Sequence, residues 1–178
     1  MGSGDAQAVC NRPFVSYKEL EGYFSNQYYV KKLLRVLFGD GVESPVEPDQ
    51  IREKYSKVFF ILLLIGKGCY IAHFIRHDDL CDQRLPFKTM PDDFPIAPPG
   101  HDFFDSFCQK QWECCAPIFQ NNMNKIFGEK EVLPIIHKER LGSGGSATTF
   151  KVSIHPAYDQ LTKNRNTEKV HKIYDKSV

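Results

Sequence analysis

Leu141-Gly142-Ser143-Gly144-Gly145-Ser146-Ala147-Thr148-Thr149-Phe150-Lys151-Val152 is the stretch of sequence that decides the fold of this chain. Apolar residues lie before it, and after it Phe150, Val152 and Ile154 alternate with polar residues. Alternation with a period of two is typical of a strand that buries one face. The pattern therefore predicts a strand, a glycine turn and a second strand.

Glycines at such a turn suit a phosphate ligand, because backbone N–H groups without a neighbouring Cβ atom can approach anionic oxygens closely. A dinucleotide-binding glycine turn should open a helix, and a Walker loop needs Gly-Lys-Ser or Gly-Lys-Thr at its end. Neither follows Gly145. A β-hairpin that covers a phosphate remains possible, and the alternative is a Gly/Ser-rich surface turn without a ligand.

The stretch resembles the glycine-rich loop of the eukaryotic protein kinase family. Gly142 and Gly144 stand at the first two glycine positions of that motif, and Ala147 stands at the third. Thr149 stands where the family has a Val that covers the adenine. The resemblance implies phosphate contacts from the backbone of Gly142, Gly144, Gly145 and Ala147, and a base covered by Leu141 and Thr149.

The kinase family carries, on the next strand, a lysine that pairs with the nucleotide phosphates. The matching segment is Lys169-Val170-His171-Lys172-Ile173-Tyr174. Residues two apart on a strand share a face, so Val170 and Lys172 would both face the nucleotide. The resemblance thus gives the phosphate-pairing role to Lys172, with Lys169 as its rival. It implies ATP as the cofactor, with Mg²⁺ only where a complete catalytic domain exists.

The resemblance begins at Leu141 and does not include the catalytic parts of the family. These parts are a Glu on the following helix, a His-Arg-Asp catalytic loop and a metal-binding Asp, and none follows the glycine loop in this sequence. We therefore expect a truncated kinase-like polypeptide without catalytic residues or a metal site, inactive by itself. The parent activity that the resemblance implies is ATP-dependent phosphorylation of Ser or Thr in proteins.

Composition and charge narrow the classes of function. The 178 residues are 42% hydrophobic with a formal net charge of +1, which is typical of a globular protein and disfavours a general binder of nucleic acid or anionic membranes. The longest apolar run, Val58 to Ile65, is less than half of the ~20 residues that cross a bilayer. No secretory signal opens the chain, and six dispersed cysteines are typical of reduced thiols. We expect a cytoplasmic or nuclear protein.

Two helices are predicted in the first part of the chain. The first starts near Ser16, with Glu19 as a possible capping-box partner, and ends at Gly39. The second starts at Pro48 and continues through a broad apolar face until Gly66. Because that face is apolar on most sides, we expect this helix at the centre of the N-terminal domain.

A repeat of possible metal ligands follows the second helix. Cys69, His73, His77 and Cys81 recur every four residues. On one continuous helix the first and last would lie ~18 Å apart, whereas one zinc ion needs all its ligands within ~2.3 Å. At most one pair four residues apart, such as His73 with His77, could share a metal ion. We therefore interpret these residues as buried cysteines and exposed or hydrogen-bonded histidines, and predict no metal site.

A proline-rich segment, residues 85–100, is predicted to run extended along the helical domain. An aromatic stripe that includes Phe103 and Phe119 then predicts a further helix, stopping near Ala116-Pro117, that packs into the core. The region from 17 to 140, especially Phe107 to Phe119, also resembles the region before kinase domains in filamentous fungal proteins. This second resemblance suggests a fungal origin and no chemistry.

The expected fold class is α+β: a mainly helical N-terminal domain followed by a small antiparallel β segment, which would be an incomplete kinase small lobe. The expected parts are a disordered segment 1–13, a helical accessory domain 14–128 with a possible protein partner, and kinase-like strands 129–178. Two alternatives remain. One is a non-enzymatic helical interaction module with vestigial strands, and the other is a winged-helix-like DNA binder, which the near-neutral charge disfavours.

Overall fold

The computed structural model describes residues 12–41, 44–92, 94, 101–121, 123–144, 147–161 and 171–175. Helices and a small antiparallel sheet are both present, so the α+β class is confirmed. The chain divides into two compact units, Val15–Cys115 and a second unit made of Ala116–Val178 with Met1–Phe14. These units differ from the predicted parts, because residue 14 and residues 116–128 group with the strands.

The first helical segment of the helical unit is broken at Asn26 into α1 (Tyr17–Ser25) and α2 (Gln27–Phe38). The Asn26 side chain accepts a hydrogen bond from the N–H of Tyr28 at 3.0 Å, which caps α2. Ser16 is the N-cap residue of α1, but its side chain makes no capping hydrogen bond. The prediction of one helix with a capping box at Ser16 was therefore wrong in both details.

Gly39 ends α2 as predicted. Its φ is 98°, a conformation that residues with a Cβ atom rarely adopt, and its N–H donates to the carbonyl of Arg35 at 2.8 Å. The next helix opens with Pro48 in its first turn, also as predicted. It consists of α3 (Pro48–Gln50), a π-helical segment (Ile51–Tyr55) and α4 (Ser56–Leu64).

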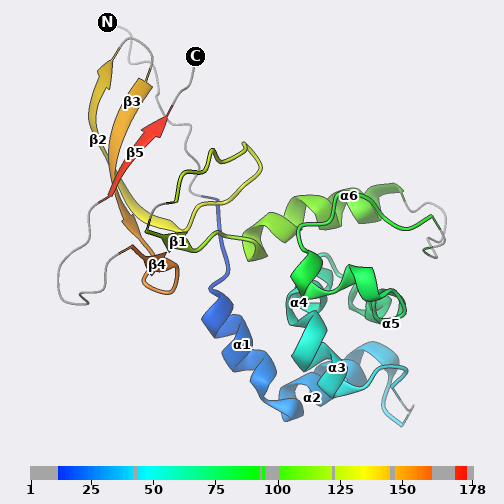
Figure 1. The fold of residues 1–178 in the computed structure, drawn as a ribbon. Helices are drawn as coiled ribbons and strands as arrows, with labels where there is room; N and C mark the ends of the chain where they lie inside the picture. Colours follow the sequence, from blue (N-terminus) through cyan, green and yellow to red (C-terminus); the bar gives the residue numbers. More distant parts are fainter. Residues whose placement is uncertain are drawn as a thin grey trace, which may run out of the picture. The chain divides into compact units, whose positions relative to one another are not determined.

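Helix α4 is the centre of the helical unit, as its apolar sequence predicted. Val58, Phe59, Ile61 and Leu62 are all fully buried. Gly66 ends the helical run with a φ of 68°. The space beside the following glycine, Gly68, is filled by leucine side chains, so a Cβ atom there would lie 2.8 Å from Leu37. Figure 1 shows α4 among the other helices of this unit.

Asp82 joins two parts of the helical unit that are distant in sequence. After α4 the chain forms the 3-10 turn Gly68–Tyr70, α5 (Ile71–Ile75) and the 3-10 turns Asp78–Leu80 and Asp82–Arg84. The Asp82 carboxylate accepts hydrogen bonds from the N–H groups of Lys57 and Val58, each at 2.9 Å. Burial raises the pKa of this carboxyl group, and the two hydrogen bonds oppose the shift. The carboxylate thus caps the start of α4.

Gln111 holds the extended segment against the helices. Its amide accepts a hydrogen bond from the N–H of Phe87 at 2.7 Å and donates to the carbonyl of Phe87 at 2.9 Å. Both side chains are buried. This contact places Phe87 against the helical unit, while residues 93 and 95–100 of the predicted extended segment lie outside the described residues.

The predicted aromatic helix is shorter than its sequence pattern. Helix α6 (His101–Lys110) gives way to a 3-10 turn (Gln111–Cys114). Phe119 lies instead in β1 (Phe119–Gln120), which belongs to the other unit. The predicted stop near Ala116-Pro117 lies just beyond this turn, and Phe119 of the stripe is buried outside any helix, with its ring 5.7 Å from that of Phe127.

The second unit contains two sheets. Strand β1 pairs in parallel with β4 (Asp159–Gln160). The larger sheet is antiparallel and has the order β2-β3-β5, with β2 at Ile135–Gly144, β3 at Ala147–Ile154 and β5 at His171–Asp175. Figure 1 shows β3 between its two neighbours.

The period of two in β3 is confirmed by burial. Phe150, Val152 and Ile154 are buried, while the residues between them are only partly buried. At the end of β3, the ring of Phe14 packs edge-on against His155 and Tyr158, with centroids 5.5 and 5.8 Å apart. Phe14 therefore belongs structurally to the unit of strands.

Replacement of Asp82 by Ala should lower the free energy of unfolding by about 1–3 kcal/mol, because two backbone N–H groups lose their acceptor. Burial raises the folded-state pKa of Asp82, so its contribution decreases as the pH rises through that pKa. The loss should therefore be larger in acid than at neutral pH in urea titrations. Asp79→Ala, whose side chain is 88% exposed, is the control and should change little. Equal losses in both variants would contradict the cap.

The thiols of the helical unit should differ in reactivity. Burial raises the pKa of Cys114 to about 12 and that of Cys115 to about 11, whereas Cys69 is exposed. Because the thiolate is the reactive form, iodoacetamide at mildly alkaline pH should modify Cys69 well before the other two. Peptide mapping by mass spectrometry measures the order, and urea should abolish it. Equal rates in the native protein would refute the protection.

Candidate functional site

The glycine stretch forms the end of a β-hairpin. In the register of β2 with β3, Gly142 pairs with Thr149, Ser143 with Thr148 and Gly144 with Ala147. Gly145, at the turn itself, lies outside the described residues. The predicted order of strand, glycine turn and strand is confirmed.

A break in the register interrupts β2, the first strand of this hairpin. The pairing shifts between Arg140 and Gly142, so Leu141 has no paired partner on β3, and its side chain is 49% exposed. Across the break, Nη2 of Arg140 donates a hydrogen bond to Oγ of Ser143 at 2.9 Å. Breaks of this kind let a strand bend and redirect a side chain. The apolar side chain of Leu141 is thereby left open to solvent.

The fold itself does not require a glycine at position 142. Its φ lies outside the left-handed region, and a Cβ atom built there would meet nothing within 4 Å. An alanine would therefore fit this backbone. What the glycine adds is a backbone without a Cβ atom, which another molecule could approach closely.

Strand β5 brings the predicted lysine position next to the hairpin. Lys172 pairs with Lys151 of β3, and Tyr174 pairs with Thr149. For β5 the structure describes the backbone. The other two predicted positions in this segment, Val170 and Lys169, lie outside the described residues. The structure thus brings Thr149 and the Lys172 position onto adjacent strands, two residues apart in register.

The two faces of the sheet differ in character. On one face, Nζ of Lys138 lies 3.5 Å from the centroid of the buried Phe150 ring, which is a cation–π contact. On the other face, Nζ of Lys151 lies 3.8 Å from a carboxylate oxygen of Glu139, and Thr149 is partly buried. The polar face is therefore the one that could receive a phosphorylated ligand.

Sequence reasoning missed four side chains in this region. Lys151 and Glu139 pair across β2 and β3, and Arg140 bonds to Ser143. The period of two already placed Lys151 on the same face as Thr149. The contact of Arg140 with Ser143 has no comparable pattern in the sequence, because it depends on the register break in β2.

The histidines of the four-residue repeat take part in ring packing. His73 and His77 both pack against Phe94, with centroids 6.0 and 5.7 Å away. Burial lowers the pKa of His73, and Arg76 adds to the shift. In the described part of the chain, no group of three or more His, Cys, Asp or Glu side chains could hold a metal ion.

None of the helices among the described residues is both long and apolar enough to cross a bilayer. Comparisons with models of protein families, with curated proteins and with solved structures found no match to this chain.

Proposed function

We propose that the β2–β3 hairpin binds ATP beneath its glycine turn, as an incomplete small lobe of a protein kinase would. In this proposal the backbone amides of the turn, at Gly142, Gly144, Gly145 and Ala147, contact the phosphates. Leu141 and Thr149 cover the base, and Val170 faces the nucleotide. Lys172 pairs with the α- and β-phosphates, and Lys169 remains its rival.

The observation that carries the proposal is the register of β3 with β5. Residues directly opposite each other in an antiparallel pair share a face of the sheet. Tyr174 is opposite Thr149, so Lys172, two residues away on β5, occupies a position on the Thr149 face. A base-covering residue and a phosphate-pairing lysine need this common face.

The open surroundings of Gly142 support the same proposal. Neither the backbone conformation nor a close neighbouring atom requires a glycine at this position. The space beside it is therefore open to a ligand. Leu141 beside it is 49% exposed and offers an apolar surface, which a base could remove from water.

Binding alone is proposed, and not catalysis. Phosphoryl transfer needs a metal ion held by carboxylate or amide side chains and a residue that positions the attacking hydroxyl. The parent activity would be phosphorylation of Ser or Thr with ATP and Mg²⁺, in a protein that also supplies those groups.

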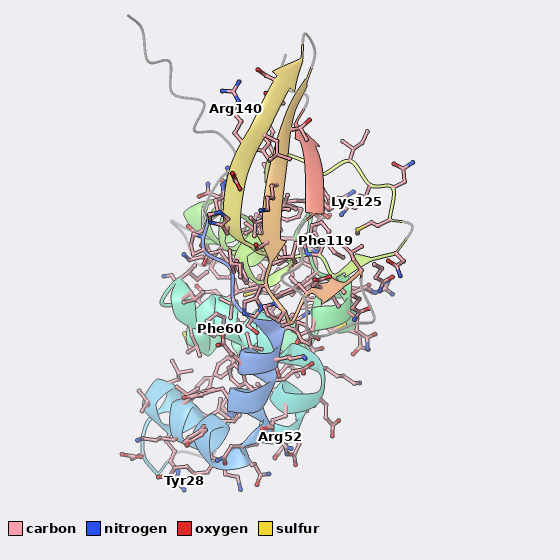
Figure 2. All side chains as sticks on the ribbon, turned by 90° about the vertical axis from the view of Figure 1, so that its left-hand side faces the viewer. Tyr28, Arg52, Phe60, Phe119, Lys125 and Arg140 are labelled. Atoms are coloured by element: carbon pink, nitrogen blue, oxygen red, sulfur yellow. The ribbon has the colours of Figure 1, made fainter. Side chains whose placement is uncertain are left out.

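A second proposal is that the helical unit binds a protein partner. Three aromatic side chains are exposed around the break between α1 and α2: Tyr23 at 47%, Tyr28 at 64% and Tyr29 at 41%. The rings of Tyr23 and Tyr29 stack with centroids 5.1 Å apart, and Figure 2 labels Tyr28 on α2. Tyrosines provide large contact area with few rotatable bonds, so they are enriched in protein interfaces.

Mg-ATP should raise the thermal unfolding temperature of the full chain. A ligand at a hundred times its Kd adds about 2.7 kcal/mol to native stability. Gly142→Ala should weaken this effect without lowering the stability of the ligand-free protein, because the new methyl group meets open space. Absence of any nucleotide effect in the unaltered chain would leave only the interaction module.

Three Lys→Met variants sharpen this experiment. Lys172→Met should abolish most of the ATP effect, and Lys169→Met should abolish it instead if that residue is the partner. Lys138→Met is the matched control, because Lys138 packs over Phe150 on the opposite face and should not contact the nucleotide. An equal loss of ATP binding in the Lys172 and Lys138 variants would contradict the assigned face.

A further inference from the structure

Ser143 is an exposed hydroxyl on the arm of the hairpin, beside a guanidinium group. Its Oγ lies 2.9 Å from Nη2 of Arg140, and both side chains are exposed. Figure 2 labels Arg140 on β2. Among the described strands β2 pairs only with β3, so β2 is an edge strand of the sheet. An edge strand is an extended segment with one side open to another protein.

The residues before Ser143 carry a definite charge pattern. Arg140 lies three residues before it and Lys138 five residues before it. Charge patterns around the acceptor residue are a principal way in which protein kinases select substrates. A kinase with carboxylates in its peptide groove would match this pattern.

We propose that Ser143 is a phosphorylation site for an arginine-directed protein serine kinase, and that Arg140 holds the resulting phosphate. In the reaction, Oγ of Ser143 forms a bond with the γ-phosphorus of ATP. The bond from that phosphorus to the bridging oxygen breaks, ADP leaves with the electron pair, and the hydroxyl proton passes to the base of the kinase. This proposal does not depend on nucleotide binding by the hairpin.

Arg140 is already in place to hold the product. A phosphoserine carries about −1.5 to −2 charges near pH 7 and three strong acceptor oxygens. A guanidinium group can bind two of these oxygens in parallel, which is stronger than its present bond to a neutral hydroxyl. The contact spans the register break between Arg140 and Gly142, so phosphorylation would stiffen the arm that carries Leu141.

The register places the phosphate away from the proposed nucleotide. Arg140 pairs with Phe150 and Ser143 pairs with Thr148, and both of these alternate with Thr149 along β3. The phosphate would therefore lie on the face opposite that of Thr149. The nearest carboxylate in sequence, Glu139, contacts Lys151 on the Thr149 face, whereas the Asp175 position of β5 is opposite Thr148 and lies two strands away from Ser143 on the phosphate face.

The first test is phosphorylation of the purified full chain with Mg-ATP and the catalytic subunit of the cyclic-AMP-dependent kinase as the arginine-directed probe. Mass spectrometry should find one phosphate at Ser143, lost in Ser143→Ala. Ser25→Ala is the matched control: Ser25 is also exposed, but its Oγ donates to the carbonyl of Gly22, and this glycine stands where Ser143 has Arg140. Modification of a peptide of residues 135–150 but not of the folded chain would overturn the proposal, as would modification of neither.

The second test separates the role of Arg140 in holding the phosphate from its role in recognition. Phosphoserine is incorporated at position 143 during synthesis, with Arg140 present or replaced in Arg140→Gln. The ³¹P resonance is then titrated with pH in both proteins. The second pKa of the phosphate, about 6 in a free phosphoserine, should be lower with Arg140 than with Gln. Equal pKa values would overturn the clamp.

Discussion

Pairing of β3 with a strand on each side is the constraint on which the candidate site depends. Because the side chains of a strand alternate between faces, the register with β2 and β5 decides which residues can meet. The pairing of Gly142 with Thr149 fixes where the glycine turn lies along β3. The pairing of Tyr174 with Thr149 fixes which face of the sheet the Lys172 position occupies. A shift of one residue in the pairing of β3 with β5 would move that lysine position to the other face.

Features that are local in sequence were predictable, and features that depend on distant contacts were not. The alternation of Phe150, Val152 and Ile154 and the stop at Gly39 follow from neighbouring residues, and both are confirmed. The cap on α4 was missed, because Asp82 is remote from Lys57 in sequence. In the candidate site, the turn was predictable from its glycines, whereas the exposure of Leu141 depends on a register break that only strand pairing creates.

Contacts at the two ends of the helical unit explain why the sequence alone misplaced its boundaries. The N–H of Val15 donates to the carbonyl of Glu113 at 2.8 Å, so the unit begins and ends at adjacent points. Phe14, one residue earlier, packs with His155 and Tyr158 of the other unit. An aromatic residue beside a helical sequence reads as part of that helix, but its packing partner lies far along the chain. The helical unit is therefore an insertion between two parts of the unit of strands.

The charged residues of the sheet suggest how one hairpin could bind two anions, one on each face. Lys151 is paired with Glu139 on one side and with the Lys172 position on the other, and like charges at paired positions are unfavourable. A phosphate bound on this face would add a negative charge beside these two paired positions. On the opposite face the Arg140 guanidinium bonds to a neutral hydroxyl, so an anion there would gain a charge-assisted contact. Since alternate residues of the same two strands supply these faces, a phosphate on Ser143 would act on a nucleotide through the bend of β2 and not by competing for the same lysine.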